Sequence, residues 1–210
     1  MEKIVTCCFM AVNIVLFLLV ELTGGSENIP NMIRWGAVYG PRIVNGGEYW
    51  RFLVSAFLHF GIAHISNNML ILFVLGPHLE RALGHIKYLV LYLAAATGAN
   101  ALAFLWKYHV MDPSVSAGAS GAVFAVSGGL LWAAVRNGGR VGELSVRQIL
   151  IFACLSMAYG LTGENVDNEV HAAGFILGFL LSVILYRPRD RKRMHQEDQS
   201  YLQRGEENDS

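Results

Sequence analysis

The sequence predicts an all-α, polytopic membrane protein in which six membrane-spanning helices form a bundle, followed by a charged tail. Composition gives the first reason: 54% of the 210 residues are hydrophobic and 15% are charged, whereas soluble domains carry about 25% charged residues. The second is charge placement, because the chain has 16 basic and 16 acidic residues and 12 of these lie after Tyr186. The third is a set of six apolar stretches, each close to the ~20 residues that cross a bilayer as a helix.

The six stretches are predicted spans that pack against one another, because several contain Gly, Ser, Asn or His. In order they are Thr6–Leu22, His64–Leu83, Tyr88–Trp106, Gly118–Val135, Val146–Leu161 and Val170–Tyr186. The first stretch has the alternative of a cleaved signal peptide, because Lys3 precedes an apolar run. The residues that follow it, Glu21 to Gly25, form a poor cleavage site. We therefore expect this stretch to be a true span.

The chain is predicted to hold one six-helix membrane domain, residues 1–187, and a charged, disordered tail, residues 188–210. Within the domain, residues 24–63 form a connection much longer than ordinary loops. This connection is rich in Trp, Tyr and Phe, which are favoured at membrane interfaces. We expect it to lie half-buried at the outer interface and to contain a short helix near Arg51–Phe57.

Lysine and arginine residues predict the orientation of the bundle. They gather in the segments on the N-terminal side of the membrane, whereas the two short outer loops hold Lys107 alone. Both termini are therefore expected in the cytoplasm. The basic run 187–193 follows the same rule and, with a net charge of zero, gives no reason to expect a nucleic-acid partner. The short N-terminal segment without a targeting signal favours a bacterial plasma membrane.

The three cysteines, Cys7, Cys8 and Cys154, have no spacing that fits a disulfide framework or a metal site. We interpret them as small lipid-facing residues. Neither a metal ion nor another cofactor is expected.

Four polar residues lie near the starts of the second, fourth and sixth spans. They are His64, Asn68, Ser120 and His171. Because these three spans run in the same direction, the four side chains are expected at a similar depth near the outer surface. Polar and ionisable residues inside a membrane indicate function by default. An alternative for His64 and Asn68 is a polar clasp between helices.

Ser120 is predicted to be a nucleophile because of its neighbours. A single serine in a membrane helix usually bonds the carbonyl four residues earlier. Here Gly118 and Gly121 flank the serine and let another chain approach the backbone. The first amides of the helix are free donors at the positive end of its dipole. These are the requirements of a nucleophile beside an oxyanion hole.

His171 is the candidate base, although a structural hydrogen bond between helices is an equal alternative from this residue alone. Gly174 and Gly178 follow on the same helix face and allow close packing against the face that bears Gly121. Such packing would bring the imidazole within reach of the serine, and Phe124 could stack on the ring. Two acidic residues precede the histidine in an outer turn, and we assign both to solvent. They are Asp167 and Glu169.

Five motifs in this order resemble the rhomboid family of intramembrane serine proteases. They are the Trp-Arg pair at 50–51, H-x-x-x-x-H-x-x-x-N at 59–68, G-x-x-x-E-x-x-x-G at 76–84, G-x-S-G at 118–121 and H-x-x-G-x-x-x-G at 171–178. The resemblance covers about residues 48–186, and the first span fits the six-helix bacterial form. It implies a rhomboid-like bundle.

The resemblance also implies roles for individual residues. Ser120 and His171 would form a catalytic dyad without an acid, and the Ser120 amide, His64 and Asn68 would bind the oxyanion. Supporting residues would be His59, Gly118, Gly121, Phe124, Gly174, Gly178, Trp50, Arg51 and Glu80. Segment 163–168 would cap a water-filled cavity, gated together with the fifth span. At Phe124 many relatives have Tyr, so we expect tuning rather than inactivity.

Family members cut the membrane segments of other proteins near the outer surface, so the implied partners are transmembrane protein substrates and the lipid bilayer. One alternative is an inactive relative that binds membrane proteins, but such relatives typically lack the serine or the histidine. A small transporter is a second alternative, but the sequence has no internal repeat of the kind expected. The sequence leaves the substrate and the oligomeric state open.

Overall fold

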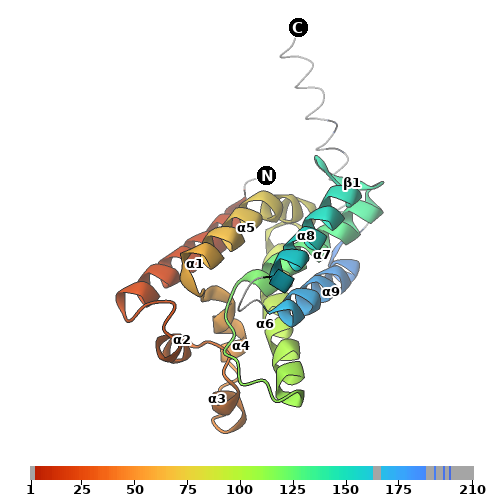
Figure 1. Ribbon diagram of the computed structural model, residues 1–210. Coiled ribbons are helices and arrows are strands. Elements are labelled where there is room, and N and C mark those ends of the chain that lie inside the picture. Colours follow the sequence, from red (N-terminus) through yellow and green to blue (C-terminus); the bar gives the residue numbers. More distant parts are fainter. Residues whose placement is uncertain (1–2, 163–166, 188–191, 193–195, 197–198, 200–210) are drawn as a thin grey trace.

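The computed structural model describes residues 3–162 and 167–187, with residues 192, 196 and 199. Each of the six predicted spans is a helix (Figure 1), which confirms the predicted helical bundle. The six helices are α1 (Ile4–Leu22), α5 (Gly61–Leu83), α6 (His85–His109), α7 (Ser120–Arg136), α8 (Val146–Thr162) and α9 (Asn168–Leu185). Helices α1, α5, α6 and α9 are long and apolar enough to cross a membrane, whereas α7 and the described part of α8 are apolar but shorter. Nearly all of the predicted tail, 188–210, lies outside the described residues, so the boundary at 187 stays a prediction.

The connection between α1 and α5 forms short helices at one end of the bundle, which we call the loop end (Figure 1). They are α2 (Ile29–Trp35), α3 (Gly40–Val44), α4 (Arg51–Val54) and the 3-10 turn η1 (Ser55–Phe57). The last two cover the segment in which the sequence predicted a short helix. Helix α2 begins where Asn28 accepts a hydrogen bond from the Asn31 amide at 3.3 Å, which satisfies a free donor of the first turn.

Arg51 anchors this connection from a position that is only 3% exposed. Its guanidinium donates to the Glu48 carboxylate at 2.7 Å and to the carbonyls of Ile33 and Ala37 at 2.7 and 3.0 Å. It also lies over the Trp50 ring, 4.8 Å from the ring centroid. One side chain therefore ties α4 to the end of α2, which suits the structural role expected of the Trp-Arg pair.

The opposite end of the bundle, which we call the hairpin end, carries a small antiparallel hairpin of β1 (Arg140–Val141) and β2 (Leu144–Ser145) (Figure 1). Strands of two residues give no alternating pattern, and the sequence did not predict them. At the same end the Glu80 carboxylate accepts hydrogen bonds from the amides of Val5 and Thr6, at 2.8 and 2.9 Å. This buried carboxylate therefore holds the first turn of α1 against α5.

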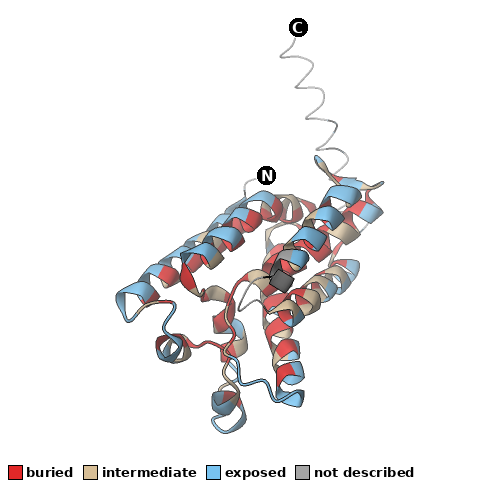
Figure 2. Cartoon of the chain, viewed as in Figure 1, coloured by how far each residue is buried: buried red, intermediate tan, exposed pale blue. Residues whose placement is uncertain are grey.

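Helix α7 lies at the centre of the bundle and packs against α5, α6, α8 and α9. Every residue from Gly121 to Leu130 is buried. Figure 2 shows exposed residues on the outer faces of α1 and α8, and buried residues on the inward sides of the helices. The outer face of α1 consists largely of apolar side chains such as Val15 and Leu18, as expected of a helix in contact with lipid. The helix is therefore buried in the protein from its second residue, Gly121, onward.

Candidate active site

Helix α7 begins within the bundle, because the coil that follows α6 runs back toward the interior before the helix starts (Figure 1). Two hydrogen bonds hold the end of this coil. The Gly118 amide donates to the Ser55 carbonyl at 2.9 Å, and the Ala119 amide donates to Nε2 of His59 at 3.3 Å. Ser120 follows as the first residue of α7 and is half-buried. The loop-end connection thus fixes the turn before the predicted nucleophile.

His59 can accept that hydrogen bond because its ring is neutral at ordinary pH. The residue lies between η1 and α5, outside the membrane-spanning segments, and is 1% exposed. Burial, with a smaller contribution from the neighbouring His64, lowers the pKa of His59 to about 3, since desolvation disfavours the charged ring. The two rings meet edge to face, with their centroids 5.2 Å apart.

Gly118 brings His64 beside the predicted nucleophile. Its φ of +151° is one that side chains disfavour. A Cβ on this residue would lie 2.7 Å from Cε1 and 2.9 Å from Nε2 of His64, and 3.6 Å from Oγ of Ser120. Only glycine therefore leaves room for the imidazole against this backbone, and the imidazole and the serine hydroxyl both lie close to this position.

Asn68 lies one turn after His64 on the same face of α5. It is 3% exposed, and its Nδ2 has no hydrogen-bond partner among the described residues. The Ser120 amide, as the first N–H of a helix, has no intrahelical partner either. Among the described residues the structure thus shows the Ser120 amide free and the His64 ring close to the serine, whereas Asn68 carries its free donor one turn further along α5.

Helices α7 and α9 meet along a seam of small residues, which we call the glycine seam. It consists of Gly121 and Ala125 on α7 and Gly174 and Gly178 on α9. A Cβ on Gly174 would collide with the carbonyl of Gly121, and one on Gly178 would collide with the backbone of Ala125. Backbones approach this closely only where side chains are absent. The seam therefore sets the distance between the two helices.

His171 lies one turn before Gly174 on α9 and faces α7. Its imidazole stacks on the Phe124 ring, with centroids 4.3 Å apart and an interplanar angle of 16°. Because Phe124 is one turn below Ser120, this contact places the imidazole along the serine face of α7. The side chains of His64, His171 and Asp167 also lie near enough for their charges to interact. Of the four polar residues expected at one depth, His64 thus lies close to both Ser120 and His171.

No acidic side chain among the described residues accepts a hydrogen bond from Nδ1 of His171. His171 is 7% exposed, and its Nδ1 has no hydrogen-bond partner among these residues. The described residues also show no hydrogen bond between Oγ of Ser120 and the imidazole. Such bonds are often long in unliganded enzymes and tighten when substrate binds. The roles of Ser120 and His171 stay a prediction.

The assignment of Asp167 to solvent was wrong. This residue, at the N-cap of α9, forms an ion pair with Lys107 at the end of α6, and its side chain is 27% exposed. The interaction joins residues that are 60 positions apart, so no local pattern reveals it. Glu169 is exposed, as expected. The predicted cap, 163–168, begins with four residues that lie outside the described part of the chain.

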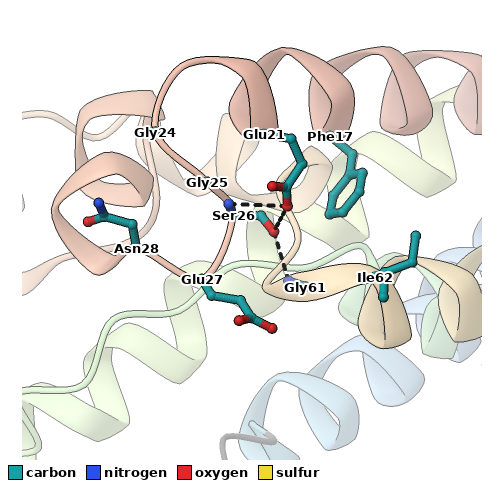
Figure 3. Close-up of a pocket in the computed structure, with 9 residues that line it drawn as sticks. All are labelled: Phe17, Glu21, Gly24, Gly25, Ser26, Glu27, Asn28, Gly61 and Ile62. Carbon is teal, nitrogen blue, oxygen red and sulfur yellow. Dashed lines mark hydrogen bonds between the residues drawn. The ribbon is translucent and has the colours of Figure 1, made fainter.

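An open hollow of about 540 Å³ lies at the loop end between α1 and α5 (Figure 3). There the Glu21 carboxylate accepts a hydrogen bond from the Ser26 hydroxyl, which in turn accepts one from the Gly61 amide at 3.1 Å. None of the described residues that line the hollow is a predicted site residue. Its polar contacts join the end of α1 to the start of α5, the helix that carries His64.

Fold and site together define a multi-pass helical membrane protein with a serine and a histidine on two adjoining helices. Residues 46–188 match the Rhomboid domain, and the chain belongs to the rhomboid family. It is 35% identical to rhomboid protease GluP of Bacillus subtilis over 184 residues, which cover 88% of this chain and 35% of that protein.

Two further relatives show how widely the similarity extends. RHOMBOID-like protein 4 of Arabidopsis thaliana is 34% identical over 70% of this chain and 37% of its own length. Putative rhomboid protease YdcA of Bacillus subtilis is 28% identical over 71% of this chain and 73% of its own length. The chain therefore spans only about a third of the length of the first two relatives.

Proposed function

We propose that this protein is an intramembrane serine endopeptidase that uses Ser120 as nucleophile and His171 as general base. The observation that carries the proposal is the stacking of the His171 ring on Phe124, one turn from Ser120, across a seam that holds α7 and α9 in contact. The rhomboid membership and the similarity to proteins named rhomboid proteases support the same function.

The proposed reaction proceeds through an acyl-enzyme. Oγ of Ser120 attacks the scissile carbonyl while His171 takes the hydroxyl proton. The oxyanion accepts hydrogen bonds from the Ser120 amide, His64 and Asn68. His171 then gives its proton to the leaving amine, the C–N bond breaks, and the acyl group stays on the serine. A water molecule, activated by the same histidine, hydrolyses the ester and restores both residues.

The proposed substrates are membrane proteins cut in or near a transmembrane segment. Lys and Arg in the chain gather toward the hairpin end, so the positive-inside rule puts that end and both termini in the cytoplasm. The loop end and the site then face outward, at the depth of the outer leaflet. Substrates would be expected to lose their outer portions to the external medium.

The function is tested with purified protein in proteoliposomes and a panel of single-span reporter substrates. Ser120→Ala and His171→Ala are each expected to reduce cleavage by about 10⁴-fold or more. Ser127→Ala is the matched control, because among the described residues this buried serine of the same helix bonds only the Val123 carbonyl, at 3.3 Å, and we expect it to cleave normally. Equal cleavage by wild type and Ser120→Ala would refute the proposal. Reporter binding without cleavage by the wild type would favour the inactive relative.

A further inference from the structure

Lys107 is buried although it lies in the last turn of α6. The sequence marks it only as the lone basic residue of a short outer loop, yet its side chain is 8% exposed. Nζ donates to the hydroxyls of Ser114 and Ser116 at 3.0 and 2.7 Å and forms the ion pair with Asp167. A lysine ammonium has three N–H donors, and this one has a described acceptor for each.

The contact of Lys107 with Ser116 reaches the coil that leads to Ser120. Ser116 is buried and pairs through its backbone with Val38, with N···O distances of 2.8 and 3.0 Å. Gly118, two residues later, is held by the Ser55 carbonyl at 2.9 Å. A shift of the coil at Ser116 would therefore be passed along two residues to the turn that carries Ser120.

The ion pair of Lys107 with Asp167 reaches α9, the helix that carries His171. Asp167 is the N-cap residue of α9, and its carbonyl accepts the first hydrogen bond of that helix, from the His171 amide at 3.2 Å. Its side chain bonds no amide of the helix, and the ion pair with Lys107 takes the place of a capping bond. The lysine thus holds the start of α9 from the end of α6.

We propose that Lys107 is a positioning residue that sets the approach of Ser120 to His171 at the loop end. This inference rests on the proposed function and adds Lys107 to the contacts that position the two residues. The glycine seam fixes the distance between α7 and α9 from Gly121 downward, whereas Lys107 fixes the coil before α7 and the start of α9. Buried ion pairs are weak contributors to stability but can specify one arrangement, which is the role assigned here.

The test separates positioning from folding. It compares Lys107→Met, which leaves the Asp167 charge unpaired, with variants that lose the contact but leave no unpaired charge. Lys107→Met leaves Asp167 without its partner, and it is expected to lower both the apparent Tm and kcat. The double variant Lys107→Met/Asp167→Asn removes the lone charge, so the apparent Tm should recover. Because the tie between the coil and α9 is still missing, kcat should remain roughly 10- to 100-fold below wild type with KM within about 2-fold, as expected of a displacement near 1 Å.

Ser116→Ala tests one contact without changing any charge. We expect several-fold lower kcat, an unchanged apparent Tm and a slower reaction of Ser120 with a fluorophosphonate probe. Lys107→Arg keeps the charge and the donors, so its kcat should be much closer to that of wild type than the kcat of Lys107→Met is. Arg42→Met is the matched control, because its pair with Glu48 is 3.4 Å long and the arginine is 60% exposed, and its kcat should equal that of wild type.

The inference is overturned if kcat of the double variant recovers together with its apparent Tm, or if Ser116→Ala has wild-type kcat and labelling rate. Failure of the proposed function would look different. In that case the wild type would not cleave, or Ser120→Ala would still cleave and be labelled, whatever residue stands at position 107.

Discussion

The glycine seam and the Arg51 anchor both fix backbone segments that the site depends on, and they do so by opposite means. In the seam, Gly174 and Gly178 lie against the backbone of α7, and the contact works because side chains are missing. At the loop end, the Arg51 guanidinium fills the space between α4 and α2 with hydrogen bonds to Glu48, Ile33 and Ala37.

The two regions fail in different ways because of this contrast. The seam needs no partner but leaves no space, so any added atom must push α9 away from α7. The Arg51 anchor tolerates small shifts, but loss of its charge removes the strong donor from three acceptors. Among the described residues, Glu48 keeps only its 3.4 Å contact with Arg42, and the carbonyls of Ile33 and Ala37 lose the guanidinium. We therefore expect changes in the anchor to act mainly on folding, and changes in the seam to act mainly on the chemistry.

The largest expected effect is that of Arg51→Met on stability. Removal of the buried guanidinium takes its donors from the half-buried Glu48 carboxylate and from two carbonyls, and each buried group left unsatisfied costs about 1–3 kcal/mol, so the apparent Tm in detergent should fall strongly. Arg42→Met is the control, because an exposed pair contributes only about 0–1 kcal/mol. Equal Tm values for the two variants would show that the anchor is not what holds the loop-end connection.

The next effect is that of Gly174→Ala on cleavage. The added Cβ meets the Gly121 carbonyl, and a displacement of α9 by about 1 Å would cost roughly 100-fold in kcat. Overpacking should also destabilise by about 1–3 kcal/mol. Gly98→Ala is a matched control on α6, because its Cβ would meet only a methyl group of Leu177 at 2.9 Å, which can rotate away. Wild-type kcat for Gly174→Ala would contradict the expectation that the glycine seam acts mainly on the chemistry.

A smaller effect concerns acid stability through His59. Its pKa is lowered to about 3 in the folded protein, against about 6.5 when unfolded. Between those values the unfolded chain binds the extra proton, so stability is lost as the pH falls below about 6.5, with a slope of up to about 1.4 kcal/mol per pH unit. Thermal unfolding between pH 7 and pH 4 measures this slope. His59→Gln should make the curve flatter, and an unchanged slope would contradict this account of His59.

The smallest effect is expected at Phe124. Stacking contributes about 0.5–1.5 kcal/mol beyond burial, so Phe124→Leu should lower kcat by about 2- to 10-fold. Phe124→Tyr keeps the stacked ring and should remain within about 2-fold of wild type. Steady-state cleavage of a reporter distinguishes the two, and a larger loss in Phe124→Tyr than in Phe124→Leu would exclude stacking as the reason.

The sequence predicted the features that repeat or that are costly in a membrane. Six apolar stretches marked α1, α5, α6, α7, α8 and α9, and the helical spacing of Gly174 and Gly178 marked the face that packs against α7. The common depth of His64, Asn68, Ser120 and His171 stays a prediction, which rests on helices that enter from one side bringing their first turns to a common level. Each of these signals is local or periodic.

What the sequence missed depends on contacts between distant residues. Asp167 was assigned to solvent because its partner, Lys107, lies 60 positions earlier on another helix. The partners of Arg51 were missed for the same reason, since two of them are backbone carbonyls. The β1–β2 hairpin has strands too short to leave a pattern.

The central claim is that Ser120, activated by His171, is the reactive nucleophile. The most direct measurement is mass spectrometry of the folded, detergent-solubilised protein after reaction with a fluorophosphonate probe. The account predicts a single adduct on Ser120, its loss in Ser120→Ala and its marked slowing in His171→Ala, with Ser127→Ala labelled at the wild-type rate. An adduct that persists in Ser120→Ala, or labelling that does not depend on His171, would contradict it.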